Sequence, residues 1–215
     1  AQDRNAEVGS GRQAPRHGRF VNEPDTDPSL LANSAWANEI VANDPGHHGI
    51  DEITDPESVH ASVAKARELA DDWSAKSGAE REQLLLTVAD KLADYRGKLM
   101  NVMAYEANKT VTQSDPEVSE AIDFCVFYGQ SARLIDESRS KFTPNKVTVV
   151  VPPWNFPVAI PVGGIVSALA AGSAVIVKPA PQVVHCAKIA VEAIHEALDE
   201  HGLDLSLIHI LRAHA

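Results

Sequence analysis

Two polar side chains, Asn155 and Lys178, each follow a short apolar run and could contact one ligand. Val147–Val151 consists of β-branched residues and is closed by two prolines, a pattern typical of a buried strand. Ala174–Val177 is a second apolar run, and it stops at Lys178. An amide donates hydrogen bonds without titrating, and a lysine is a mobile cation. The two residues can therefore form a polar ligand site if the fold brings them to one crevice.

The residues between the two runs predict a helix. Small and apolar residues fill positions 158–171, Pro157 suits the first helical turn, and Gly172 suits the end. Strand, helix and strand in this order predict a βαβ unit with parallel strands and a right-handed crossover. Parallel strands end at the same edge of a sheet, where open α/β sheets bind ligands. We therefore expect Asn155 and Lys178 to lie about one or two strand spacings apart. On spacing alone, a buried unit in which Asn155 holds the turn and Lys178 is solvated explains the pattern equally well.

The stretch from Val149 to Pro181 adds a family resemblance. It reads PWNFPVAIP and then GGIVSALAAGSAVIVKPAP, and it closely resembles the aldehyde dehydrogenase superfamily. The resemblance implies that Asn155 is catalytic, its amide donating to the oxyanion of a thiohemiacetal, and that Lys178 binds the adenosine ribose of NAD or NADP. It implies a cofactor-binding set at the two strand ends: Pro152, Pro153, Trp154, Lys178, Ala180 and Pro181.

Elementary chemistry agrees with these implied roles. Attack of a thiolate on an aldehyde places negative charge on the carbonyl oxygen, and a preorganised neutral amide stabilises that charge. The glycines of the stretch do not form a GxGxxG motif, so cofactor binding would depend on the helix and the strand ends. Many relatives that use NAD carry a ribose-binding Glu three residues after the lysine. Pro181 occupies that position here, so both NAD and NADP remain open.

Composition limits the function classes. The chain has 215 residues, of which 44% are hydrophobic and 23% charged, which is enough for one or two globular domains with a core. The net charge of −11 and the lack of long basic clusters argue against nucleic acid and anionic membranes as partners. No apolar run reaches the roughly 18 residues of a membrane span. Without a signal peptide pattern, a cytoplasmic location is expected.

The cysteines and histidines do not predict a disulfide or a metal site. Cys125 and Cys186 are the only two cysteines, and both lie in helical patterns among apolar residues, so we expect buried, unreactive thiols. The nine histidines are scattered. His185 and Cys186 are neighbours, but adjacent residues of a helix point about 100° apart and do not easily face one metal ion. We expect no metal ligands.

The predicted organisation has three parts. Residues 1–18 are polar and are expected to be disordered or a linker. Residues 19–204 are expected to form the N-terminal, cofactor-binding part of an aldehyde dehydrogenase domain. The fold class is α/β, with a helical region that leads into a Rossmann-like parallel βαβ sheet, truncated in this chain. Residues 205–215 depart from the family pattern, and SLIHI suggests a non-native tail translated from adaptor or vector sequence.

Apolar periodicity predicts the helices of the middle part. The first is expected to have Asp27 as its N-cap and Pro28 as its first residue. The other predicted helices are Pro56–Ala75, Ala79–Asp94, Arg96–Ala107, Glu117–Glu137 and Val183–His201. On these helices we expect core positions for Phe124, Phe127 and Tyr128, and solvated carboxylates for Glu82, Glu106 and Glu120.

The entry segment narrows the substrate. FVNEPDTDPSLLANSAWA resembles the glutamate-semialdehyde dehydrogenase part of bifunctional proline-utilisation enzymes. This resemblance implies oxidation of L-glutamate gamma-semialdehyde to L-glutamate, with a small aldehyde as substrate. It also implies a homo-oligomeric parent that is fused to, or paired with, a proline dehydrogenase domain. Two alternatives stay open, namely an aldehyde dehydrogenase of another substrate class and a non-catalytic fragment or pseudoenzyme.

The implied catalytic cysteine and glutamate base are missing from this stretch of sequence. In the family both lie much further after the asparagine than residues 156–215 extend. Cys186 lies in a predicted helix without the Gly-rich context of the family nucleophile, so it is not expected to be catalytic. The chain as given is therefore expected to be inactive. A cysteine in a Gly-rich context downstream would favour an enzyme over a pseudoenzyme.

Overall fold

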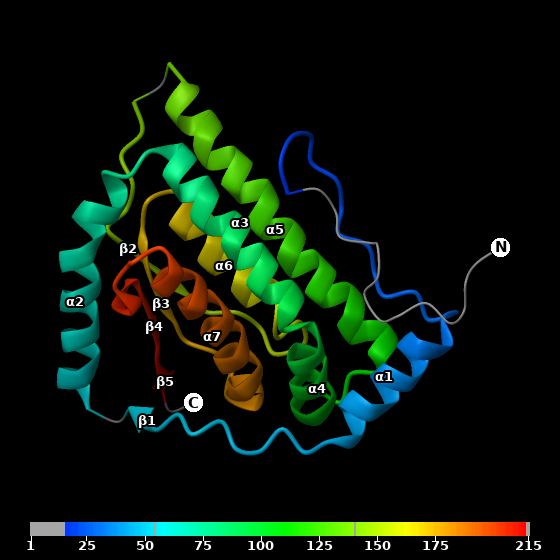
Figure 1. Ribbon diagram of the computed structural model, residues 1–215. Coiled ribbons are helices and arrows are strands. Elements are labelled where there is room, and N and C mark those ends of the chain that lie inside the picture. Colours follow the sequence, from blue (N-terminus) through cyan, green and yellow to red (C-terminus); the bar gives the residue numbers. More distant parts are fainter. Residues whose placement is uncertain (1–15, 54, 140, 214–215) are drawn as a thin grey trace.

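A computed structural model describes residues 16–53, 55–139 and 141–213 of the chain. Helices occupy most of it, and short parallel strands lie between them (Figure 1). The α-helices are α1 Leu31–Ala42, α2 Pro56–Ser74, α3 Gly78–Asp94, α4 Arg96–Ala107, α5 Val111–Glu137, α6 Ala159–Ala170 and α7 Val184–Glu200. Two 3₁₀ turns, η1 Pro181–Val183 and η2 Leu205–Leu207, flank α7 on either side.

The main sheet has three parallel strands in the order β2-β3-β4, with bounds Val147–Val150, Ala174–Val177 and Ile208–Ile210. The first two strands pair in register from Val147 opposite Ala174 to Val150 opposite Val177. The intervening helix, α6, makes this pair the βαβ unit that the sequence predicts. A separate two-stranded parallel ladder joins β1, Glu52–Ile53, to β5, Arg212–Ala213.

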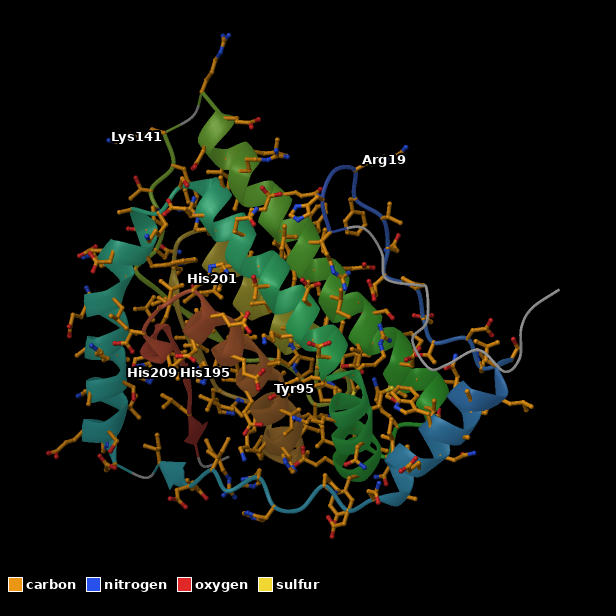
Figure 2. The ribbon with its side chains drawn as sticks, viewed as in Figure 1. Arg19, Tyr95, Lys141, His195, His201 and His209 are labelled. Atoms are coloured by element: carbon orange, nitrogen blue, oxygen red, sulfur yellow. The ribbon has the colours of Figure 1, made fainter. Side chains whose placement is uncertain are left out.

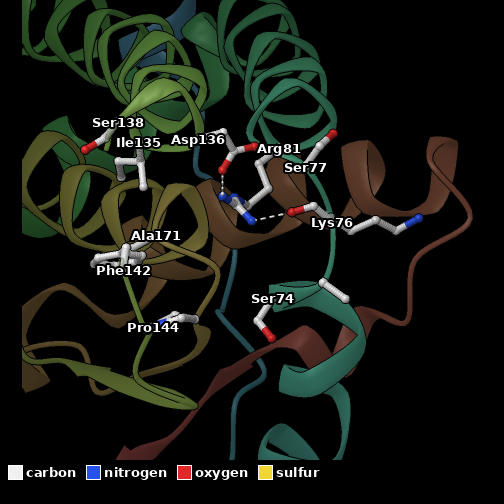
Figure 3. Close-up of a pocket in the computed structure, with 11 residues that line it drawn as sticks. Ser74, Lys76, Ser77, Arg81, Ile135, Asp136, Ser138, Phe142, Pro144 and Ala171 are labelled. Carbon is white, nitrogen blue, oxygen red and sulfur yellow. Dashed lines mark hydrogen bonds and ion pairs between the residues drawn. The ribbon is translucent and has the colours of Figure 1, made fainter. Parts of the chain in front are cut away.

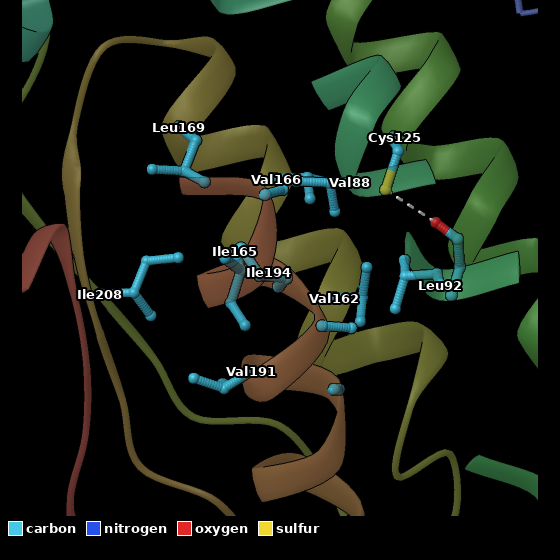
Figure 4. Packing of buried hydrophobic residues seen from close by; sticks show 14 of the residues in the cluster. Val88, Leu92, Cys125, Val162, Ile165, Val166, Leu169, Val191, Ile194 and Ile208 are labelled. Atoms are coloured by element: carbon cyan, nitrogen blue, oxygen red, sulfur yellow. Dashed lines mark hydrogen bonds between the residues drawn. The ribbon is translucent and has the colours of Figure 1, made fainter. Parts of the chain in front are cut away.

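The elements form successive layers around one core (Figure 1). Helix α2 covers one face of the sheet, α6 and α7 cover the other, and α3 and α5 pack outside α6 and α7. Figure 4 shows the interior of this stack, where side chains from α3, α5, α6, α7 and β4 meet. The α/β fold with a leading helical region is therefore confirmed. Helix α6 is apolar nearly all round because it is enclosed on both sides.

Helices α1 and α5 begin at least three residues away from their predicted starts. Helix α1 begins at Leu31 because Asp27 accepts the Ser29 N–H at 2.9 Å and forms a turn ahead of the helix instead of capping it. Helix α5 begins at Val111, earlier than the predicted Glu117. The start is fixed by a side chain, since the Thr110 N–H donates to Gln113 Oε1 at 3.0 Å.

The aromatic prediction for α5 is wrong for one of its three residues. Phe124 and Tyr128 pack against the core, whereas Phe127 is 52% exposed. The Phe127 ring meets the Phe20 ring edge-on, with 6.0 Å between centroids. It therefore packs against the entry segment and not in the core. Sequence periodicity alone does not single out Phe127, because positions i, i+3 and i+4 lie on the same side of a helix.

The chain ends are better integrated than the sequence predicts. Residues 1–15 of the predicted linker lie outside the described residues, but Arg16 is ion-paired with Glu23 at 2.5 Å and with Asp90 at 3.0 Å. In the predicted departing tail, residues 208–210 pair with β3 as strand β4, and Ile208 is buried. The tail therefore completes the sheet as a third strand. Its non-native origin remains a prediction.

Polar contacts join α3 to α7 on the outer side of the stack. The Tyr95 hydroxyl, just after α3, donates to the Glu196 carboxylate, and this hydrogen bond raises the pKa of Tyr95 to about 12. His201, just after α7, shares a 2.9 Å hydrogen bond with Thr87 of α3. Tyr95 and His201 are labelled in Figure 2. These contacts hold α3 against α7, next to α6.

The close approach of α3 to α5 gives a stability prediction. A Cβ atom at Gly78, the first residue of α3, would lie 2.2 Å from the Ala132 carbonyl oxygen of α5. We expect Gly78→Ala to lower the free energy of unfolding by about 1–3 kcal/mol, because backbone atoms cannot yield as a side chain can. Thermal unfolding of the full-length protein measures this.

Gly97→Ala in α4 is the matched control, since its Cβ would meet side-chain atoms rather than backbone, with Ile40 Cδ1 at 3.0 Å and Trp36 Cζ2 at 3.4 Å. Alanine is also favoured over glycine in a helix by about 1 kcal/mol. The control is expected to be neutral or stabilising. Equal unfolding temperatures for Gly78→Ala and the wild type would contradict the close packing of α3 on α5.

Candidate active site

The sheet delivers Asn155 and Lys178 to one edge. Asn155 lies in the turn after β2, and Lys178 directly follows β3, which is the adjacent parallel strand. The Lys178 N–H donates to the Val150 carbonyl at 2.9 Å and so extends the pairing to the ends of both strands. The predicted placement at the carboxyl edge is confirmed. Asn155 is exposed and Lys178 is half-buried, and no described residue forms a hydrogen bond or ion pair with either side chain.

The turn that carries Asn155 is held from both sides. Pro152 is buried at its start, while Pro153 and Trp154 are exposed. At its end, α6 begins at Ala159 rather than at the predicted Pro157. A proline restricts its own backbone angles and those of the residue before it, so the short segment has few alternative conformations.

A buried glutamate of α5 caps the helix that follows this turn. Glu117 Oε1 accepts the Val158 N–H at 2.8 Å and the Ala159 N–H at 3.1 Å. Its Oε2 is ion-paired with Lys109. Both side chains are largely buried, and negative charge at a helix N-terminus is favourable because the first N–H groups have no partner within the helix. Sequence reasoning did not identify Glu117, since it lies 41 residues before Val158 and no local motif connects them.

A second glutamate caps α7 in the same way. Glu106 accepts the His185 N–H at 3.0 Å and the Cys186 N–H at 2.9 Å. The prediction that Glu106 is solvated is therefore wrong, because the tertiary fold brings it onto a helix end from 79 residues away. Glu120 is exposed as predicted, and Glu82 forms a 3.5 Å ion pair with Arg133.

The cofactor residues implied by the sequence lie after the two strands. Ala180 is half-buried and Pro181 is exposed and opens η1. The sequence predicted cofactor binding at the helix and the strand ends, but the first N–H groups of α6 and α7 already donate to Glu117 and Glu106. The strand ends remain, where Lys178 provides a cation with no protein partner among the described residues. This arrangement fits a dinucleotide held through ribose hydroxyls.

Both thiols are buried, as predicted. Burial raises the pKa of Cys125 and of Cys186, and the nearby Glu106 carboxylate raises that of Cys186 further. The Cys125 Sγ contacts the Ala121 carbonyl at 3.3 Å in the core (Figure 4). A thiol with a raised pKa is a poor nucleophile near neutral pH because little of it is thiolate.

A cavity of about 360 Å³ lies at the other end of the sheet, between α2, α3 and α5 (Figure 3). Its lining includes Pro144, which precedes β2, and Ala171, which precedes β3, so it borders the amino ends of the strands. The Arg81 guanidinium inside it donates to the Lys76 carbonyl at 2.5 Å and contacts Asp136 at 3.4 Å. We assign this cavity a structural role because the buried Arg81 joins α3 to α5 and to the turn between α2 and α3.

The entry segment is fixed along α5. The Asn22 side chain and the Glu23 N–H donate to Asp123 at 2.6 and 2.7 Å, and the Thr26 N–H donates to Asp115 at 2.6 Å. The entry segment, whose resemblance suggested the substrate, thus has a packing role. Among the described residues, no three His, Cys, Asp or Glu side chains form a metal-binding group, and no helix has the length and apolarity needed to cross a membrane.

Comparison with known proteins shows which family this chain resembles. The sequence model of the Aldehyde dehydrogenase family matches residues 50–214. Bifunctional protein PutA of Escherichia coli (strain K12) is 36% identical over 127 residues, which are 59% of this chain and 10% of that protein. Alpha-ketoglutaric semialdehyde dehydrogenase of Bacillus subtilis (strain 168) is 30% identical over 207 residues, 91% of this chain and 40% of that protein.

Solved structures agree. Proline Utilization A (PutA) from Corynebacterium freiburgense has a TM-score of 0.80 and 40% sequence identity, over 92% of this chain and 19% of that one. The chain thus spans less than half the length of each of these relatives. The family match includes the strands that carry Asn155 and Lys178 and also the tail strand β4. With more than half of its residues matched in this way, the chain belongs to the aldehyde dehydrogenase family.

Proposed function

We propose that this chain supplies the oxyanion donor and part of the dinucleotide site of an NAD(P)-dependent aldehyde dehydrogenase. The proposed reaction is oxidation of L-glutamate gamma-semialdehyde to L-glutamate in proline catabolism. One observation carries the proposal: the exposed Asn155 amide follows β2, and Lys178, which has no ion-pair partner among the described residues, follows the adjacent parallel strand β3 at the same edge. This edge is where open α/β sheets bind ligands.

The chemistry assigned to this chain is electrostatic. Thiolate attack on the aldehyde carbon moves an electron pair onto the carbonyl oxygen, and the Asn155 amide donates a hydrogen bond to that oxyanion. Lys178 would hold NAD(P) at this edge through ribose hydroxyls or phosphate, and the bound cofactor would supply the hydride acceptor. Both cysteines of the chain are buried, so we assign the thiolate to another part of the enzyme.

Proline catabolism is supported by the relatives and by the entry segment. The Escherichia coli relative is named as a bifunctional protein, and the Corynebacterium freiburgense structure is titled Proline Utilization A. We extend the proposal to a homo-oligomeric parent that is fused to, or paired with, a proline dehydrogenase domain. Such a partner would oxidise proline to the cyclic imine 1-pyrroline-5-carboxylate, and hydrolysis of its C=N bond by water gives the semialdehyde.

A second substrate is favoured by a specific observation. The Bacillus subtilis relative, whose name gives alpha-ketoglutaric semialdehyde as substrate, aligns over 91% of this chain, against 59% for the Escherichia coli protein. Both aldehydes carry a carboxylate, so an aldehyde site alone does not separate them. Measuring kcat/KM of the full-length protein for both semialdehydes decides. If kcat/KM is about tenfold or more higher for alpha-ketoglutaric semialdehyde, that aldehyde becomes the proposed substrate in place of L-glutamate gamma-semialdehyde. A tenfold ratio corresponds to about 1.4 kcal/mol in transition-state binding.

We expect Asn155→Ala in the full-length protein to lower turnover by about two to three orders of magnitude, which is the effect of losing one oxyanion donor. The dissociation constant of the cofactor should change little. Asn145→Ala, another exposed asparagine before β2, is the control and should keep wild-type turnover. Turnover of Asn155→Ala within a few fold of the wild type would refute the oxyanion role.

We expect Lys178→Ala to raise the Michaelis constant for the cofactor more than it lowers turnover, because the contact is remote from the reacting atoms. If the lysine meets a 2′-phosphate, the rise should be larger for NADP than for NAD. Lys141→Ala removes an exposed lysine elsewhere and serves as control. Unchanged constants for both dinucleotides would place Lys178 outside the site.

Residues 1–215 alone should reduce neither NAD nor NADP in the presence of glutamate semialdehyde. Covalent catalysis needs an accessible thiolate, and both thiols here are buried with raised pKa values. Absorbance of the reduced cofactor measures the rate against a buffer blank. A rate above the blank that disappears in Cys186→Ser would make Cys186 the nucleophile and overturn this assignment.

A further inference from the structure

The turn that carries Asn155 depends on two residues that come from outside the βαβ unit. Glu117, on α5, is only 3% exposed and accepts both the Val158 and the Ala159 N–H groups. These are the first donors of α6, directly after the turn. The backbone three residues beyond Asn155 is therefore fixed to a different helix layer by two hydrogen bonds to one carboxylate.

Lys109 connects the same carboxylate to the turn itself. Its Nζ is ion-paired with Glu117 Oε2 and lies 4.5 Å from the centroid of the Phe156 ring. Phe156 is the residue next to Asn155. A cation over an aromatic face is attracted by the ring quadrupole, more strongly when it is partly desolvated, and the Lys109 side chain is 12% exposed. The carboxylate, the ammonium group and the ring thus form a continuous brace from α5 to the turn.

This brace has a consequence for catalysis because Asn155 has no support of its own. Its side chain is exposed, and no described residue forms a hydrogen bond with it. An oxyanion donor is effective only when it is preorganised, since a group that must be oriented during the reaction loses much of its benefit. Misplacement by about 1 Å can cost up to roughly a hundredfold in rate.

We propose that Glu117 and Lys109 are positioning residues for the oxyanion donor, acting on Asn155 through the α6 N-terminus and Phe156. The inference rests on the proposed oxyanion role of Asn155. It assigns a catalytic consequence to an ion pair that is not in the site and whose partners contact neither aldehyde nor cofactor. The brace fixes where the Asn155 amide points, and Asn155 makes the contact with the oxyanion.

A purely structural cap would give a different result from a positioning brace. A cap that only stabilises the fold would lower activity by the same factor whether or not Asn155 is present. A residue that acts through Asn155 loses its effect once that amide is removed. A double-mutant cycle separates these cases, because coupling appears as a departure from additivity.

The experiment uses the full-length protein and measures the rate of cofactor reduction in the first turnover, with both substrates saturating. Glu117→Gln is made in the wild type and in Asn155→Ala. The glutamine keeps an oxygen for the two N–H groups but loses the charge that holds Lys109. We expect a loss of roughly 10- to 100-fold in the wild-type background and less than about twofold in the Asn155→Ala background.

Two further variants complete the design. Glu120→Gln neutralises an exposed carboxylate on the same helix and should leave the rate unchanged. Lys109→Met keeps an apolar contact for Phe156 but removes the cation, and it should repeat the Glu117→Gln pattern in both backgrounds. Thermal unfolding is recorded for each variant, and Lys109→Met provides the cycle if Glu117→Gln fails to fold.

The outcomes separate the two proposals. Equal losses in both backgrounds, or no loss in the wild-type background, would overturn the positioning role while leaving the oxyanion role of Asn155 intact. If Asn155→Ala alone keeps the wild-type rate, the oxyanion role fails and the positioning role fails with it. A loss that is confined to the background with Asn155 supports both.

Discussion

Parallel pairing of β2 with β3 is the constraint on which the candidate site depends. The register sets Val150 opposite Val177, and the Lys178 N–H continues the ladder onto the Val150 carbonyl. Because both strands run the same way, whatever follows them leaves from one edge. The crossover helix α6 must then return across the sheet, and it packs closely enough that a Cβ at Gly164 would lie 2.7 Å from the Val150 side chain. Strand ends and helix are thus fixed as one unit.

Two carboxylates, the buried Glu117 and the half-buried Glu106, then determine the shape of that edge. Glu117 and Glu106 each accept two backbone N–H groups at the start of α6 and α7. Burying a charge is costly unless it is paired and hydrogen-bonded, and the Glu117 carboxylate meets both conditions with Lys109 and two N–H donors. Removing one partner of such a pair typically costs about 3–5 kcal/mol, since the other charge stays buried. These carboxylates also accept the first N–H groups of both helices, so the proposed dinucleotide site depends on the strand ends.

The helical layers in front of the sheet explain why more than a hundred residues precede β2 in the chain. Helices α3 and α5 enclose α6, and the entry segment is fixed along α5 through Asp115 and Asp123. Arg96 connects this contact to α4, since it donates to Asp115 at 2.9 Å and to the Ser119 hydroxyl at 3.1 Å. The motif that resembles one branch of the family is thus a packing element.

The sequence by itself determined the βαβ unit, the edge that carries Asn155 and Lys178, and the family, because strand, helix and turn signals are local and the PWN stretch is continuous. It also determined that both cysteines are buried, since apolar neighbours at helical spacing bury a thiol. Only the tertiary structure decided the role of Glu117 and Glu106, the exposure of Phe127 and the pairing of Ile208–Ile210 as a third strand. The physical reason is distance along the chain: a carboxylate finds its helix end 41 or 79 residues away only once the layers are assembled, and no local pattern records that partner.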